Sequence, residues 1–157
     1  MRIIRRCTLV LLLLSESAMA ALFGNLFAGT APANLGVQAG KLAPCPESPN
    51  CVNSQAKDAT HLIAPIAYEG DATAAMTRLA QVIARQPGAK LVTQRGDYLY
   101  TTFQTPLMGF VDDVEFVADP VRHAIEVRSA SRLGYGDFGV NRTRIETVRA
   151  ALAVETR

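Results

Sequence analysis

The stretch F-V-D-D-V-E-F-V-A at residues 110–118, followed by A-I-E-V-R-S at 124–129, predicts a β-hairpin. In the first stretch, Val114 and Phe116 alternate with Asp113 and Glu115, and the second stretch alternates in the same way. Successive side chains of a strand point to opposite faces, so one face of this hairpin is apolar and the other is charged. Asp112 falls on the face opposite to Asp113 and Glu115.

The apolar residues of one strand face those of the other only in registers where the numbers of two paired residues add up to an odd number. The dipeptide Asp119-Pro120 is typical of the start of a type I turn. A four-residue turn there places Phe116 opposite Ile125 and Asp113 opposite Arg128, although it also sets two glutamates against each other. We expect this register.

The rest of the fold follows outward from the hairpin. A helix is indicated after Asp71 by apolar residues at helical spacing, and Pro87-Gly88 ends it. A second helix is expected from about Asn141, with Ile145 as part of its buried side. The remaining strands are expected at 62–68, 89–93 and 98–105. The sequence thus predicts an α+β domain with the order β-α-β-β-β-β-α, whose antiparallel sheet of about five strands is covered on one face by two helices.

The first twenty residues have the layout of a secretory signal peptide. Three arginines precede a short apolar stretch that ends at Leu14, and Ala18-Met19-Ala20 is a small-x-small cleavage site. The stretch is shorter than the ~20 residues that a membrane-spanning helix needs, so an uncleaved anchor is the weaker alternative. Residues 21–44 are expected to be a flexible leader, and 45–157 a single domain.

The chain of 157 residues is 49% hydrophobic and 19% charged, which is typical of a globular protein. Residues 1–20 hold three arginines and Glu16, so cleavage would leave 16 − 3 = 13 basic and 14 − 1 = 13 acidic residues. A domain of zero net charge lacks the basic surface that nucleic acid or an anionic membrane requires. We therefore expect a periplasmic or secreted protein with no nucleic-acid partner and no membrane span after cleavage.

Cleavage would also remove Cys7 and leave an even pair, Cys45 and Cys51. In an oxidising compartment this pair is expected to form a disulfide across C-P-E-S-P-N-C. The spacing does not match the C-x-x-C of redox enzymes, and a zinc site would need both His61 and His123. No metal or cofactor is expected.

Charged residues concentrate in two segments that the hairpin brings near each other. The acidic strand contributes Asp112, Asp113 and Glu115, which cannot converge on one metal ion because they occupy both faces of a strand. Arginines gather between residues 128 and 144, where Arg142 and Arg144 stand in the first turn of the second helix, a place that the helix dipole makes unfavourable for cations. Two readings remain open: ion pairs with the acidic strand, or a site for an anionic ligand. The candidate ligand-binding residues are Arg128, Arg132, Asn141, Arg142, Asp112, Asp113, Glu115 and Asp137.

Three ordered motifs carry a resemblance to a known family: C-P-E-S-P-N-C-V-N-S-Q at 45–55, G-F-V-D-D-V-E-F at 109–116, and R-S-A-S-R-L-G-Y-G-D-F-G-V-N-R-T-R-I at 128–145. With these motifs the chain resembles the bacterial and plastid family called domain of unknown function 1499. The resemblance implies an exported or membrane-associated single domain and supplies no reaction. It also implies that the candidate residues, together with Ser129, form one polar unit.

We expect a non-enzymatic binding module whose polar surface holds a small anionic ligand or an envelope protein. One alternative is a hydrolase that uses Asp113 or Glu115 as a general base. The other is a purely structural envelope protein, in which the polar unit serves only to stabilise the fold.

Overall fold

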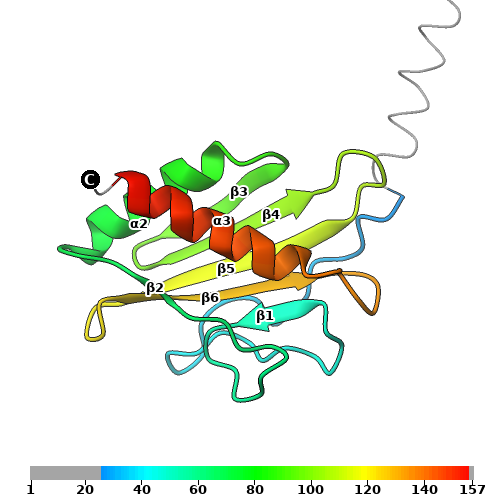
Figure 1. The fold of residues 1–157 in the computed structure, drawn as a ribbon, viewed down its shortest axis with the longest axis horizontal. Helices are drawn as coiled ribbons and strands as arrows, with labels where there is room; N and C mark the ends of the chain where they lie inside the picture. The colour runs from blue at the N-terminus through cyan, green and yellow to red at the C-terminus, as the bar shows by residue number, and fades with distance from the viewer. Residues whose placement is uncertain (1–25, 156–157) are drawn as a thin grey trace, which may run out of the picture.

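The computed structural model describes residues 26–155, which form six strands and two helices (Figure 1). In chain order the elements are β1 (Cys51–Asn53), β2 (Ile66–Ala67), α2 (Ala72–Ala84), β3 (Ala89–Arg95), β4 (Tyr98–Gln104), β5 (Val111–Asp119), β6 (Ala124–Ser131) and α3 (Val140–Glu155). The expected signal peptide at 1–20 and its cleavage site lie outside the described residues. Neither of the two helices is long and apolar enough to cross a membrane.

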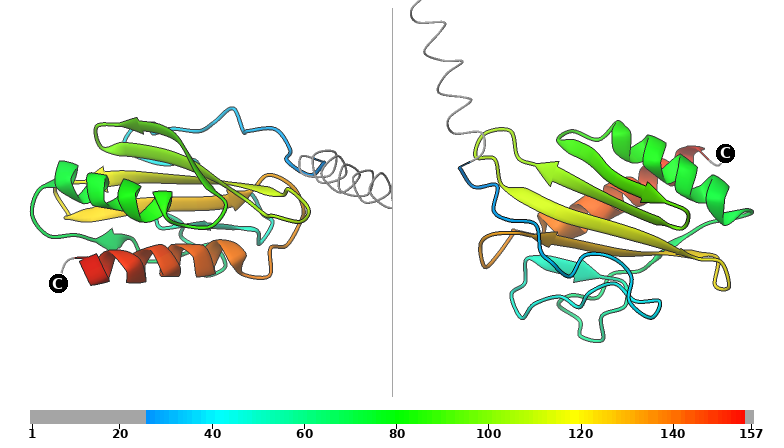
Figure 2. Two further views of the ribbon diagram at one scale, coloured as in Figure 1. Left: turned by 90° about the horizontal axis from the view of Figure 1, so that it is seen from above. Right: turned by 180° about the vertical axis from the view of Figure 1, so that it is seen from behind.

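The strands form one antiparallel sheet in the order β1-β6-β5-β4-β3, and β2 pairs with the same edge of β6 as β1 does. Both helices pack on one face of this sheet (Figure 2). This confirms the α+β fold predicted from the sequence. The sequence did not indicate β1, because three residues are too few to show a strand period. The strand expected at 62–68 is reduced to β2, since Pro65 has no N–H to give to a ladder.

The hydrophobic core lies between the helices and the sheet. On α2, whose N-cap is Asp71 as predicted, the buried side includes Met76 and Leu79. On α3, Ile145 and Val148 are fully buried. The sheet residues that meet them alternate along their strands and include Leu99, Val114, Phe116, Ile125 and Val127. This face of the sheet is called the helix face below.

The β5–β6 register differs from the one expected. Opposed residues do have odd sums, but Phe116 faces Val127 instead of Ile125, and Arg128 faces Glu115 instead of Asp113. The strands continue further toward the turn, where Asp119 faces Ala124. The Asp119 side chain accepts hydrogen bonds from the backbone N–H of residues 121 and 122, and His123 closes the loop with a left-handed φ of 48°. The longer loop places opposite charges across the hairpin.

Residues 26–44, called the strap below, cross the other face of the sheet (Figure 2). The Phe27 ring stacks on Phe110 with 4.9 Å between centroids, and the Gly36 N–H donates to Glu115 Oε1 at 2.6 Å. Further along, Leu42 is buried and donates through its N–H to Gln55 Oε1. Residues 21–44 were predicted to be a flexible leader outside the folded domain, whereas residues 26–44 pack onto the sheet. Residues 21–25 lie outside the described part.

The predicted disulfide between Cys45 and Cys51 is present, with 5.7 Å between the two Cα atoms. It ties the end of the strap to the first residue of β1, and Cys51 is buried. The covalent link therefore joins the segment that covers the sheet to an edge strand of the same sheet.

Candidate functional site

The sheet divides the candidate residues into two clusters, one on each face. Asp113 and Glu115 point to the strap, whereas Asp112 points to the helices, as the alternation along β5 predicts. Because β5 pairs with β6 throughout, the D-D-V-E strand and the R-S-A-S-R stretch lie side by side. Each carboxylate meets a different arginine, so the polar unit consists of two separate networks.

The strap-face cluster is centred on Asp113, of which only 1% is exposed. The carboxylate receives hydrogen bonds from Arg132 Nε at 2.9 Å and Arg132 Nη2 at 2.8 Å, and Tyr100 donates its hydroxyl at 2.7 Å. Arg132 Nη1 also reaches the Ala28 carbonyl of the strap at 3.4 Å. These contacts engage both oxygens of Asp113 and hold the strap against the sheet.

Glu115 and Arg128 form a looser pair in the same cluster. Glu115 Oε1 accepts from the Tyr98 hydroxyl at 2.8 Å and from the Gly36 N–H, but its Oε2 lies 3.6 Å from Arg128 Nη1. Arg128 is 5% exposed, and its Nε and Nη1 are buried without hydrogen-bond partners among the described residues. Burial lowers the pKa of the Arg128 guanidinium, against the opposing effect of Glu115. The pair is therefore held by charge attraction rather than by hydrogen bonds.

The two tyrosines of this cluster predict a pH effect. Burial, together with the hydrogen bond to Asp113, raises the pKa of Tyr100 from 10.0 to about 12, and burial raises the pKa of Tyr98 as well. A group with a raised pKa in the folded state adds stability below its unfolded pKa, and this stability is lost as the pH rises through the folded pKa. We therefore expect the free energy of unfolding to fall between pH 10 and about pH 12.

Urea unfolding at a series of alkaline pH values measures this effect. In a Tyr100→Phe variant, the unfolding free energy should fall less steeply between pH 10 and about pH 12, because one titrating group no longer contributes to the slope. The exposed Tyr135 supplies the control, because Tyr135→Phe should keep the wild-type slope. A wild-type slope in Tyr100→Phe would contradict the assignment.

The helix-face cluster is centred on Asn141, which is fully buried at the start of α3. Its Oδ1 accepts from Ser129 Oγ at 2.5 Å and from Arg144 Nη1 at 2.7 Å. Its Nδ2 donates to the Asn50 carbonyl at 3.0 Å and to Ser131 Oγ at 3.1 Å. One side chain thus connects α3 to β6 and to the segment before β1.

Arg144 connects this cluster to the acidic strand. Its Nη2 lies 2.5 Å from Asp112 Oδ2, and its Cζ lies 4.6 Å from the centroid of the Phe103 ring. A cation over an aromatic face gains electrostatic attraction in addition to the ion pair. The expected compensation for a cation in the first turn of a helix is therefore present, through Asp112 and Phe103.

Asp137 caps the first turn of α3. Its side chain accepts from the N–H of Gly139 at 3.0 Å and of Asn141 at 2.8 Å, and also from Asn141 Nδ2. Partial burial acts to raise the pKa of Asp137, but these hydrogen bonds outweigh it and the pKa is lowered. Asp137 therefore satisfies free N–H groups at the start of α3 and, through Asn141 Nδ2, is joined to the buried network.

Arg142 lies apart from both clusters, although it was predicted to belong to the polar unit. Its Nη2 donates to the Thr60 carbonyl at 3.1 Å in an exposed contact. Arg144 was left out of the candidate residues, yet its position three residues after Asn141 puts both on one side of a helix. Tyr98, Tyr100 and Gly36 were also missed. The alternation in β4 could have identified the two tyrosines, but the sequence contains no signal for the contact of Gly36.

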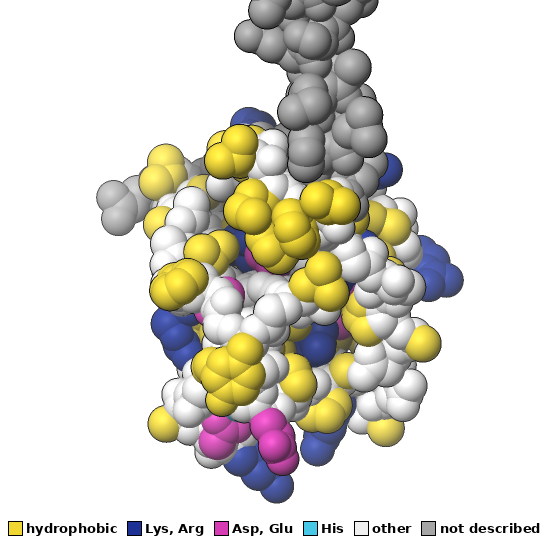
Figure 3. Space-filling view, turned by 90° about the vertical axis from the view of Figure 1, so that its right-hand side faces the viewer, with side chains coloured by type: hydrophobic (Ala, Val, Ile, Leu, Met, Phe, Trp, Pro, Cys, Tyr) yellow, Lys and Arg dark blue, Asp and Glu magenta, His cyan; other side chains and the backbone are white. Residues whose placement is uncertain are grey.

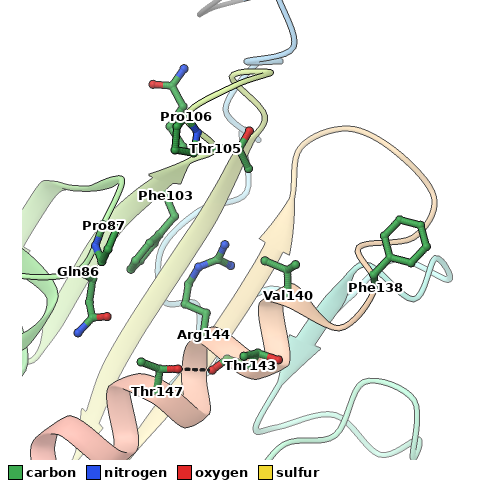
Figure 4. A pocket seen from close by; sticks show the side chains of 11 residues that line it. Gln86, Pro87, Phe103, Thr105, Pro106, Phe138, Val140, Thr143, Arg144 and Thr147 are labelled. Atoms are coloured by element: carbon green, nitrogen blue, oxygen red, sulfur yellow. Dashed lines mark hydrogen bonds between the residues drawn. The ribbon is translucent and has the colours of Figure 1, made fainter.

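A cleft of about 370 Å³ opens beside Arg144, at the end of the molecule where α3 begins (Figure 4). Phe103 and Arg144 lie side by side within it, and Thr143 and Thr147 of α3 line one wall. The remaining lining residues are Gln86, Pro87, Gln104, Thr105, Pro106, Phe138 and Val140. The cleft is mainly apolar, and Arg144 is its charged group. The Arg144 side chain thus belongs both to the lining of the cleft and to the helix-face cluster.

No group of His, Cys, Asp or Glu in residues 26–155 is arranged to hold a metal ion. His61 lies near the disulfide loop, where its Nδ1 is 2.8 Å from Asp58 Oδ1 and its Nε2 is 3.2 Å from the Ser48 carbonyl. Each ring nitrogen of His61 therefore lies within hydrogen-bond distance of another residue.

Residues 41–152 match the model of the family described as protein of unknown function DUF1499. The matched range runs from the end of the strap to the last turns of α3 and includes the residues of both clusters except those of the strap, Ala28 and Gly36. Comparison with curated proteins and with solved structures gave no match.

Proposed function

The chain belongs to the DUF1499 family, and from this premise we propose that it is an exported binding domain of the cell envelope, without catalytic activity. Its ligand site is the cleft beside Arg144. The ligand is a small amphiphile with an apolar body and an anionic end. The observation that carries the proposal is that a partly buried, oriented guanidinium lines a mainly apolar cleft.

Export is supported by two features. The sequence begins with the basic, apolar and small-residue segments of a signal peptide, and residues 45–51 form a disulfide loop. Disulfides persist in oxidising compartments such as the periplasm.

The cleft has the composition of a small-molecule site, in which apolar walls surround a few oriented polar groups. Asp112, Asn141 and Ser129 hold the Arg144 side chain in one orientation, so little side-chain freedom is lost when a ligand binds. Those contacts use three of the five hydrogen bonds that a guanidinium donates, which leaves donors for an anionic group. Phe103 and Pro87 offer surface to the apolar body of the ligand.

The geometry argues against the alternative that Asp113 or Glu115 is a general base. Both side chains are buried beneath the strap and already accept hydrogen bonds, and a general base must reach the proton of a substrate. The purely structural alternative accounts for the two networks but gives no role to the cleft.

Octanoate tests the proposal, because it combines an apolar chain with a carboxylate. We expect octanoate, below its micelle concentration, to shift the amide NMR signals of residues around the cleft in uniformly labelled protein. It should bind at least about fivefold more tightly than octan-1-ol, because a charge-assisted hydrogen bond adds about 1 kcal/mol or more. Equal affinities, or shifts centred on Arg78 and Arg149 in the second cleft of about 430 Å³, would contradict the assignment.

A matched pair of substitutions locates the site without disturbing the buried network. Thr147 lines the cleft, and its Oγ1 donates to the Thr143 carbonyl at 2.9 Å. Thr77 on α2 makes the same contact with the Thr73 carbonyl at 2.8 Å, away from the cleft. Thr147→Trp should fill the cleft and lower octanoate affinity at least tenfold, on the order of 1.4 kcal/mol, whereas Thr77→Trp should not change it. Equal affinity in the two variants would reject the cleft as the site.

A further inference from the structure

Exposed apolar side chains gather at the end of the molecule where the described chain begins. Figure 3 shows this end, with hydrophobic side chains spread across its surface. Three segments contribute to it: the start of the strap, the β4–β5 loop, and the loop between β6 and α3. We call this surface the apolar end; its exposed members are Leu26, Leu107, Met108, Leu133, Tyr135 and Phe138.

The start of the strap contacts both loops. Phe27 stacks on Phe110 at the end of the β4–β5 loop. A Cβ atom built on Gly29 would lie 2.9 Å from Arg132 Cβ and 3.1 Å from Leu133 Cγ, so the strap passes directly beside the loop before α3. The apolar side chains therefore form one neighbouring group rather than isolated surface residues. A contiguous exposed apolar patch marks a site of interaction with a protein or a membrane.

We propose that the apolar end docks on the surface of a phospholipid bilayer. Within this group the side chains project from loop tips: Leu107 is 85% exposed and Tyr135 is 77% exposed. Projecting apolar side chains suit insertion between lipid headgroups. Tyrosine is also typical of the membrane interface, where its ring is partly buried and its hydroxyl remains in water.

The charges at this end are compatible with a lipid surface. The β4–β5 loop, T-P-L-M-G-F at 105–110, contains no charged residue, and neither does Leu133–Gly136. The two charged side chains that flank the second loop are directed inward, Arg132 onto Asp113 and Asp137 onto the first turn of α3. Bilayer contact would therefore bury no unpaired charge from either loop tip.

The position of the chain start favours a bilayer over another protein. Leu26, the first described residue, belongs to the apolar end, and the sequence immediately before it contains Leu22 and Phe23. A further apolar run lies upstream in the sequence, at 9–14. The affinity of a protein for the membrane interface grows with the apolar area that it buries there.

The chain contains no tryptophan, so a single introduced tryptophan reports its own surroundings. We expect the emission of a Tyr135→Trp variant to shift to shorter wavelength when phosphatidylcholine vesicles are added to the protein purified from its expression host. The control is Val121→Trp in the β5–β6 loop, at the opposite end of the molecule, where Val121 is 89% exposed (Figure 1). An equal shift in both variants, or none in Tyr135→Trp, would overturn the proposal. A concentration-dependent shift without vesicles would also overturn it, since the surface would then be an interface between copies of the chain.

Vesicle flotation with a second matched pair tests whether the apolar end provides the affinity. Leu107→Asp should lower the partition constant for vesicle binding by about tenfold, because a charge replaces an inserted apolar group. Val121→Asp, with the same N-terminal sequence and an equally exposed position, should bind like wild type. Neither residue lines the octanoate cleft, so a negative result here leaves the proposed ligand site unaffected. Equal binding of the two variants would contradict docking through this surface.

Discussion

Replacing Arg132 with methionine is expected to lower the free energy of unfolding by about 3–5 kcal/mol. Arg132 supplies the cation for Asp113, and the substitution leaves that carboxylate buried beneath the strap with the Tyr100 hydroxyl as its remaining partner. An unpaired charge in a site that is 1% exposed retains little solvation. Urea denaturation at neutral pH, with the disulfide intact, measures the loss.

Arg142→Met is the matched control for this prediction. Arg142 lies in the first turn of α3, and within residues 26–155 its hydrogen bond is to the Thr60 carbonyl at the surface. Arg142→Met should therefore lower the free energy of unfolding by less than about 1 kcal/mol. A double variant, Asp113→Asn with Arg132→Met, removes both charges and keeps an oxygen that accepts from Tyr100. It should be more stable than Arg132→Met alone, and a less stable double variant would show that the isolated carboxylate is not the cause.

Replacing Asn141 with alanine is expected to lower the free energy of unfolding by about 2–4 kcal/mol. Alanine is the better helix former, so any loss must come from the side-chain contacts. The substitution removes the acceptor of Ser129 and Arg144, and the donor to the Asn50 carbonyl, from a site that is fully buried. Each polar group left without a partner there retains its desolvation cost.

Asn34→Ala in the strap provides the comparison, because Asn34 is exposed. Its change in unfolding free energy should lie within about 0.5 kcal/mol. Thermal unfolding of the two variants, followed by circular dichroism, gives the comparison directly. A loss below about 1 kcal/mol in Asn141→Ala would mean that the helix-face network does not depend on the amide.

The two networks explain why the charges in this chain do not form the single surface that its sequence suggested. Asp112 and Asp113 are adjacent in sequence, yet one pairs with α3 and the other with Arg132 beneath the strap. Of the candidate arginines, Arg128 and Arg132 are matched to buried carboxylates, whereas Arg142 binds only a backbone carbonyl among the described residues. Two surfaces face solvent instead. One is the cleft that Arg144 of the helix-face cluster lines, and the other is the apolar end next to it.

Much of the fold could be predicted from residue patterns alone. The hairpin followed from two-residue alternation, and α2 from its spacing, its Asp71 cap and its Pro87-Gly88 ending. The Cys45–Cys51 pairing followed from the even number of cysteines after residue 20. These features depend on residues close together in the chain, where spacing determines geometry. The split of the acidic residues between two faces was predictable for the same reason.

The tertiary structure decided the features that join distant segments. The hairpin register depended on a loop whose geometry is set by Asp119 and His123, and no local pattern separated it from the register two residues shorter. The strap has no periodicity, so its place over Asp113 and Glu115 arises from backbone contacts such as that of Gly36. The exclusion of Arg142 and the inclusion of Arg144 followed from the direction in which α3 faces the sheet. Local sequence encodes which side chains share a face, whereas long-range packing determines which faces meet.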